Sequence, residues 1–199
     1  MHARVGIYKV KPGTLDASLA KARAELLPGM REQPGLKRYT VVTTGPDSFV
    51  SLSGWETRAQ AEQAAETLSR WVKENMGKTV VSAENHIGEV TLLHGQTAPD
   101  NTPKYGMVRV ATRKPDAPDM TERMRAEFMP LHDQQPGFNS FATLVADDGT
   151  RITFIGWDSK EALEKARPTL SRWGEANVAP HMAKVEVQEG AVAWSVRKG

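Results

Sequence analysis

Hydrophobic and polar positions alternate in some stretches of the chain and recur with a helical period in others. Residues 5–10 alternate and are rich in β-formers, which predicts a strand, and a Lys-Pro-Gly turn follows it. From Thr14 onward, apolar residues return at steps of three and four, which predicts an amphipathic helix. Pro28 and Gly29 are expected to end or kink this helix, because proline lacks a backbone donor and clashes with the preceding turn.

The rest of the first half predicts three more strands and a second helix. Residues 36–44 and 49–55 are rich in β-formers and are separated by a short turn, which is typical of a hairpin. Thr57 with Gln60 three residues later predicts a capping box at the start of the second helix. A last strand is predicted at 86–94. The order β-α-β-β-α-β is that of a ferredoxin-like unit.

The second half predicts the same order of elements. They are a strand at 105–112, a helix at about 118–131, a hairpin of strands at 138–145 and 151–157, and a final strand at about 191–196. Asp158 with Glu161 resembles a second capping box. Pro168 is expected to split or kink the helix that follows this box.

Identical words recur in the two halves, which indicates a tandem duplication. Gly54-Trp55 returns as Gly156-Trp157, and Thr-Leu-Ser-Arg-Trp, first found at 67–71, also returns 102 residues later. Matches from Arg23 with Arg125 to Gly88 with Gly190 keep this spacing of 102 residues without a slip. The predicted organisation is one unit at 1–95, a linker at 96–104 and a second unit at 105–199.

Several strands are apolar on both faces, although a strand with one wet face would alternate. Ile152, Phe154 and Ile155 break the alternation in one of them. Each such side chain contributes roughly 1.5–3 kcal/mol when buried, so we expect the sheets of the two units to pack face to face, as a pseudo-dimer within one chain. Arg109 alternates with valines and is expected to point into this seam, where it would need a carboxylate partner. The predicted fold class is α+β, with two tandem ferredoxin-like units.

Composition narrows the function classes. The chain has 39% hydrophobic and 25% charged residues and a net charge of +2, which is typical of a soluble globular protein. Its basic residues form no run of the kind that nucleic-acid binding favours. The absence of cysteine excludes disulfides, thiolate nucleophiles and Cys-ligated metals, and the five histidines show no metal-ligand spacing. No apolar run approaches the ~20 residues of a membrane span, so a cytoplasmic protein is expected.

Three short motifs resemble those of a known family. They are a Lys-Pro-Gly turn after the first strand, Pro-Gly-Leu or Pro-Gly-Phe before the second, and Gly-Trp-Glu or Gly-Trp-Asp at the end of the third. These resemble the antibiotic-biosynthesis monooxygenase family of the dimeric α+β barrel superfamily, over both repeats. The resemblance implies that the two units form, within one chain, the barrel that members usually make from two chains.

The resemblance also implies a class of chemistry. Family enzymes include quinone-forming monooxygenases, which oxidise polycyclic aromatic substrates with dioxygen and use no metal or flavin. An enzyme of this kind would take a small aromatic or quinol-type substrate and need no cofactor. Other members degrade haem, for which His181 is the nearest candidate ligand, near the end of the last helix.

The resemblance places a pocket between sheet and helices, near the tryptophan that ends the third strand. The candidate catalytic residues are Trp55, Trp157, Asn75 and Asn177. The candidate substrate-binding residues are Tyr8, Ser51, Thr153, Arg70 and Arg172. Each has a structural alternative. The tryptophans could anchor the strand end, the asparagines could cap their helices, and the arginines could extend into solvent.

Two other functions remain open beside the monooxygenase hypothesis. The chain could be a non-catalytic small-molecule-binding or stress-related module, or a haem-binding protein. The two halves are expected to be unequal, because Leu163 stands at the position equivalent to Ala61, and Pro168 at that equivalent to Glu66. One unit could therefore keep a cavity that the other closes. Association of two chains into a further homodimer is also possible on this sequence.

Overall fold

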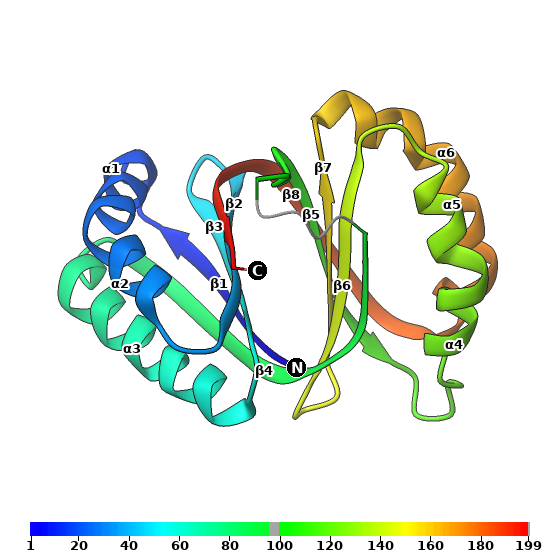
Figure 1. Ribbon diagram of the computed structural model, residues 1–199, viewed down its shortest axis with the longest axis horizontal. Coiled ribbons are helices and arrows are strands. Elements are labelled where there is room, and N and C mark those ends of the chain that lie inside the picture. Colours follow the sequence, from blue (N-terminus) through cyan, green and yellow to red (C-terminus); the bar gives the residue numbers. More distant parts are fainter. Residues whose placement is uncertain (96–99, 199) are drawn as a thin grey trace.

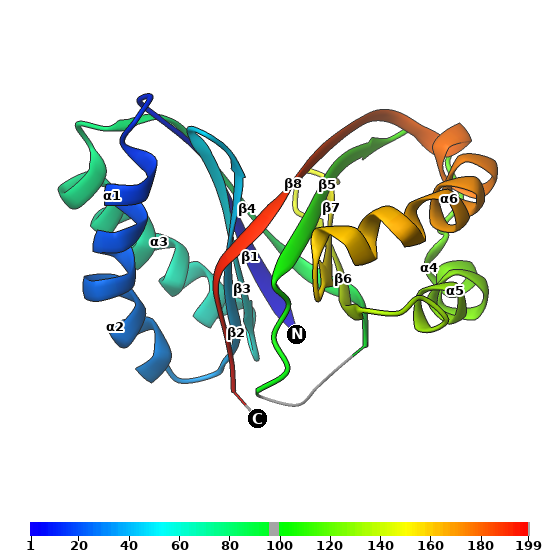
Figure 2. The same cartoon turned by 90° about the horizontal axis from the view of Figure 1, so that it is seen from above.

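A computed structural model describes residues 1–95 and 100–198. Eight strands form one closed barrel in the order β1-β3-β2-β8-β5-β7-β6-β4, and the helices lie outside it in two groups (Figures 1 and 2). Each unit has the predicted order β-α-β-β-α-β. The α+β fold class is confirmed, and the two sheets face each other across the barrel interior. Residues 96–99 of the predicted linker lie outside the described residues.

The first unit supplies the helices on one side of the barrel. Its elements are β1 (His2–Val10), α1 (Leu15–Lys21), a π-helical turn (Ala22–Leu26), α2 (Leu27–Glu32), β2 (Leu36–Gly45), β3 (Ser48–Trp55), α3 (Arg58–Met76) and β4 (Val80–Gly95). The capping box is confirmed: the Thr57 side chain accepts from the backbone N–H of Gln60, and the Gln60 side chain accepts from that of Thr57.

The second unit supplies the helices on the opposite side. Its elements are β5 (Tyr105–Arg113), α4 (Thr121–Arg123), a π-helical turn (Met124–Phe128), α5 (Met129–Asp133), β6 (Phe138–Ala146), β7 (Arg151–Trp157), α6 (Lys160–Asn177), a 3₁₀ turn (Ala179–His181) and β8 (Met182–Arg197). The predicted second capping box is wrong by one residue. Ser159 is the N-cap of α6, and its hydroxyl accepts from the N–H of Ala162.

Prolines interrupt neither helical layer. Pro28 and Pro130 each sit in the first turn of an α segment that directly follows a π-helical turn, where a backbone N–H is not needed. Of the two outcomes expected at Pro28, an end or a kink of the helix, the end is wrong, because the helix continues to Glu32. The expected split at Pro168 is also wrong, because α6 continues through it. Packing of the apolar face of α6 against the sheet holds this helix together, since tertiary contacts contribute more than local propensity.

Two long strands, β4 and β8, close the barrel. Each has 16 residues and pairs first within its own unit and then with the other unit, β4 with β1 and β6, and β8 with β5 and β2. Both begin several residues earlier than predicted. At the crossing points, Gly88 and Gly190 have no space for a side chain, because a Cβ there would collide with backbone carbonyls of the facing strand, at Val145 and Thr43. The matched glycines thus permit barrel closure.

The repeat frame slips by one residue after the first strand. Tyr105 pairs with Trp157 and His2 pairs with Trp55, so β1 and β5 correspond at 105 − 2 = 103 residues, whereas β3 and β7 correspond at 157 − 55 = 102. The predicted 102-residue frame, which rests on matches between residues 23–88 and 125–190, holds over that range but does not extend to the first strand. A one-residue slip in a strand reverses the direction of its side chains relative to the repeat. Arg109 accordingly points toward the helices of its unit and not into the barrel interior.

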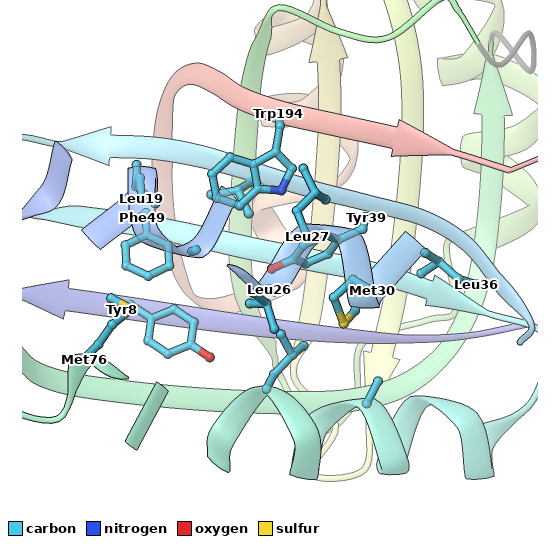
Figure 3. Packing of buried hydrophobic residues seen from close by; sticks show 14 of the residues in the cluster. Tyr8, Leu19, Leu26, Leu27, Met30, Leu36, Tyr39, Phe49, Met76 and Trp194 are labelled. Carbon is cyan, nitrogen blue, oxygen red and sulfur yellow. The ribbon is translucent and has the colours of Figure 1, made fainter. Parts of the chain in front are cut away.

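Buried apolar side chains form three clusters. One lies between sheet and helices in the first unit, one in the same place in the second unit, and one inside the barrel. Figure 3 shows the first, where the Tyr8 and Phe49 rings stack with centroids 4.7 Å apart beside Met76. The candidate sites below lie at the edges of these clusters.

Candidate functional site

A buried arginine organises the space between sheet and helices in the first unit. Arg4, on β1, is 0% exposed. Its Nη1 donates to Ser51 Oγ at 2.5 Å, and its Nη2 donates to the hydroxyl of Tyr8 and to Oδ1 of Asn85. No carboxylate in the described part of the chain pairs with it. A buried guanidinium with only neutral partners is costly, and such a cost points to a role beyond stability.

The strand positions explain how this cluster is assembled. Arg4, Gly6 and Tyr8 share one face of β1 because side chains alternate along a strand. Gly6 is required between the other two, since a Cβ there would collide with both the Arg4 guanidinium and the Tyr8 ring. The Arg4 Cζ also lies 5.7 Å from the centroid of that ring. We call Arg4, Tyr8, Ser51 and Asn85 the Arg4 cluster.

The hydrogen bonds from Arg4 leave donor groups free on two of its partners, Tyr8 and Asn85. The Tyr8 oxygen accepts from Arg4, so its own O–H is available to another acceptor. Asn85 accepts through Oδ1, so both hydrogens of its amide nitrogen are also available. Tyr8 and Asn85 line a cavity of about 260 Å³ beneath α3, together with Ser69 and Lys73. None of the described lining residues is acidic, so this arrangement suits an oxyanion.

Burial also affects the second tyrosine of this unit. Burial raises the pKa of Tyr39 to about 12, although the positive charge of Arg4 acts in the opposite direction. Tyr39 therefore stays a neutral phenol at physiological pH. It adds no negative charge that would neutralise Arg4.

The second unit has lost the Arg4 cluster. With the 103-residue correspondence of β1 and β5, Met107 takes the place of Arg4, Arg109 that of Gly6 and Ala111 that of Tyr8. A cavity of about 60 Å³ remains between sheet and helices, and Arg109, Arg113 and Arg151 line it. Burial lowers the pKa of Arg109. The expectation that the halves are unequal thus agrees with the two cavities.

Comparison with known proteins relates the first unit to one family. Residues 1–73 match the family model described as antibiotic biosynthesis monooxygenase. The first unit is therefore similar to the antibiotic biosynthesis monooxygenase family. The matched segment includes Arg4, Tyr8 and Ser51 and ends at Lys73 on α3, so it covers most of the Arg4 cluster and part of its cavity. No curated protein matches the sequence.

Solved structures share the whole two-unit architecture of this chain. A candidate monooxygenase of Fusobacterium nucleatum matches with a TM-score of 0.77 at 11% identity, over 100% of this chain and 94% of the other. One of Lactobacillus acidophilus matches with a TM-score of 0.76 at 9% identity, over 100% and 96%. An anthrone oxidase-like protein matches with a TM-score of 0.64 at 16% identity, over 100% and 93%. At these identities the likeness shows a shared fold.

The structure separates the predicted site residues of the first unit. Tyr8 and Ser51 come together in the Arg4 cluster. Trp55 is buried and donates to Ser53 Oγ at 2.9 Å. Asn75 donates to the carbonyl of Trp71 at 3.0 Å, as a helix-capping side chain does, and Arg70 is exposed on α3. Among the described lining residues of the 260 Å³ and 60 Å³ cavities, neither cavity includes Trp55, Asn75 or Arg70.

The counterparts in the second unit behave similarly. Asn177 donates to the carbonyl of Trp173 at 2.9 Å, and Arg172 is exposed. Thr153 lines the 60 Å³ cavity and shares a hydrogen bond of 2.9 Å with Thr143. Sequence reasoning missed Arg4 and Asn85. One local signal could have found Arg4: it lies four residues before Tyr8 on the same strand, so the two side chains share a face, whereas Val5 lies on the other.

A buried histidine and tryptophan lie together in the second unit. His132 and Trp157 are both 0% exposed, with ring centroids 6.3 Å apart. His132 Nδ1 lies 3.0 Å from the carbonyl of Phe128, which can only accept, so Nδ1 carries the proton. His132 Nε2 and Trp157 Nε1 have no partner within residues 1–95 and 100–198. Burial lowers the pKa of His132 to about 4.

The two strand-end tryptophans offer a matched test of a buried hydrogen bond. Trp55→Phe removes the donor to Ser53, whereas Trp157→Phe removes a buried donor without a partner. Both changes delete the same ring atoms. We expect Trp157→Phe to lower the free energy of unfolding by about 1–2 kcal/mol less than Trp55→Phe, measured by urea denaturation. Equal losses, or a larger loss for Trp157→Phe, would contradict the assignment of these hydrogen bonds.

Residues 1–95 and 100–198 contain no group of three or more His, Asp or Glu side chains placed to hold a metal ion. His181, the candidate haem ligand, lies in the 3₁₀ turn after α6. Within the same residues, no helix combines the length and apolarity needed to cross a bilayer.

Proposed function

We propose that the first unit is a cofactor-independent monooxygenase that oxidises a small phenol or anthrone with dioxygen. The proposal is supported by the likeness of this unit to the family and by one observation: Arg4, which has no carboxylate partner within residues 1–95 and 100–198, donates to two side chains that line a cavity. Phenols and anthrones become oxyanions when they lose a proton. Such an anion is the species that reacts with dioxygen and that this cavity would bind best.

The reaction balances without another reductant. In an anthrone, a CH₂ group becomes a carbonyl while dioxygen is reduced by four electrons, and one oxygen atom enters the product and the other leaves as water. In a phenol, the ring C–H opposite the hydroxyl becomes the second carbonyl of a quinone, again with one water. The substrate supplies all four electrons, and the proton that it loses passes to solvent water, so the protein needs to bind and stabilise the anion.

The residues of the Arg4 cluster would have distinct roles. Tyr8 O–H and the Asn85 amide would donate to the substrate oxygen, whose negative charge grows as the proton is lost. Arg4 would act as a positioning residue, because it fixes both donors from behind and adds a positive charge in a poorly solvated place. Lys73, on the exposed side of the cavity, would attract the anionic form of the substrate.

Oxygen uptake tests this function directly. The purified chain, treated with chelator and free of flavin, would be given an anthrone or a phenol in an oxygen-electrode cell while quinone absorbance is recorded. We expect one dioxygen consumed for each quinone formed, above the rate of autoxidation. Asn85→Asp provides a matched control, because its carboxylate would neutralise Arg4 and repel an oxyanion. Ligand binding without oxygen uptake would refute catalysis and favour the non-catalytic binding module instead.

A further inference from the structure

The barrel interior contains a cavity separate from the Arg4 cluster. Its volume is about 490 Å³, within the range of ~300–1,000 Å³ that is usual for small-molecule sites. Its floor is formed by buried side chains of the interior cluster, which fill the rest of the barrel: Val5, Leu144, Ile152 and Phe154. The cavity therefore occupies one end of the barrel and is closed at its inner end.

Small and aliphatic residues form the walls of this cavity. Ala3 and Leu52 come from the sheet of the first unit, Ala142 from that of the second, and Val90 from β4, which joins the two. Large residues at the alanine positions would close the space. An aliphatic wall of this kind binds hydrocarbon, since polar groups would lose their hydrogen bonds to water there.

The mouth of the cavity is rich in cations. Lys37, Arg38, Arg197 and Lys198 all line it. Arg38 donates to Ser140 Oγ across the barrel at 3.0 Å.

Two acids lie near these cations. Glu56 pairs with Lys37 at 2.6 Å, and Asp133 pairs with His94, another lining residue, at 2.7 Å. Without counting Arg197, the three cations Lys37, Arg38 and Lys198 outnumber these two acids among the described residues, so the mouth is net positive. A positive rim above a hydrocarbon wall complements a molecule that has an apolar tail and an anionic head.

We propose that the barrel cavity binds a medium-chain carboxylate, with its alkyl chain on the aliphatic floor and its carboxylate among the cations of the mouth. Ala3 and Val5 reach this cavity from the face of β1 opposite to Arg4 and Tyr8. The proposed ligand thus lies on the other side of the sheet from the proposed oxidation site. The two proposals can therefore fail independently.

Calorimetric titration with decanoate and decanol tests this inference. We expect decanoate to bind one site per chain, about tenfold (roughly 1.4 kcal/mol) more tightly than decanol, because only decanoate carries a negative charge that complements the cations of the mouth. A negative heat-capacity change should accompany both, since apolar surface is buried. No saturable binding of decanoate below millimolar concentration, or equal affinities for the two ligands, would overturn the proposal.

Matched variants locate the site. Ala142→Trp should fill the cavity and weaken both ligands at least tenfold, whereas Ala59→Trp, on the exposed start of α3, should change neither. Ala3→Leu provides a milder filling variant if the tryptophan prevents folding. The double variant Lys37→Gln, Lys198→Gln should weaken decanoate about tenfold and leave decanol unchanged. The control pair Lys160→Gln, Lys165→Gln removes the same charge from α6. Unchanged decanoate affinity in both filling variants would refute the barrel site.

Discussion

Arg4→Met is expected to reduce kcat/KM of the proposed oxidation by about 10²–10³-fold, which is the usual loss when aligned oxyanion donors are removed. Without the guanidinium, Tyr8 and Asn85 lose the contact that directs them into the cavity. The loss should fall mainly on kcat, because the negative charge on the substrate is largest in the transition state. Steady-state oxygen uptake on the folded variant measures it.

The same substitution is expected to preserve or increase stability. Arg4 is fully buried and has no anionic partner in the described part of the chain, so an apolar side chain of similar length avoids its desolvation cost. The second unit already has methionine, Met107, at the corresponding position. We expect a free energy of unfolding equal to that of the wild type or about 1–3 kcal/mol higher, measured by urea denaturation.

These two results together separate function from folding. A variant that loses activity and remains stable shows that Arg4 serves the reaction. Activity within threefold of wild type would refute the role of the Arg4 cluster. A large loss of stability would show that Arg4 is needed for the core. Arg4→Lys keeps the charge but not the planar fork that reaches three acceptors, so it should recover only part of the activity.

His132 is expected to make the chain lose stability in mild acid. Its pKa is about 4 in the folded protein, against an ordinary value of 6.5, and burial is the main cause. Between about pH 6.5 and 4, His132 is therefore protonated in the unfolded chain and neutral in the folded chain. The stability from neutral His132 is complete above about pH 6.5 and decreases as the pH falls to about 4. Over this window the loss is about 3 kcal/mol.

His132→Met isolates this contribution from other titrations. Met30 occupies the equivalent, equally buried place in the first unit, so methionine suits this environment. Carboxylates such as Asp119 also titrate toward the acid end of the window, but they do so in both proteins. Urea denaturation at steps between pH 7 and 4 measures the free energy of unfolding of both proteins. Over this range the variant should lose about 3 kcal/mol less than the wild type. If the free energies of unfolding of the two proteins change with pH in parallel, His132 becomes protonated in the folded protein over this range, and the expectation is wrong.

Local and repeated patterns of the sequence determined the order of elements. The change between a period of two and a helical period placed the strands and helices to within a few residues, except for the starts of β4 and β8. Thr57 and Gln60 gave a helix start because a capping box involves only neighbours. Strands that are apolar on both faces predicted that the two sheets face each other, since free energy from burial requires a second surface.

The tertiary structure alone decided where the candidate sites lie. The first halves of β4 and β8 are exposed, so no apolar pattern revealed that these strands close the barrel. Two of the three partners of Arg4 lie 47 and 81 residues away in the sequence, and its charge gave no sign of burial. The barrel cavity is assembled from strands of both units. The reason is physical: secondary structure follows from contacts between near neighbours in sequence, whereas cavities and buried charges depend on residues that only folding brings together.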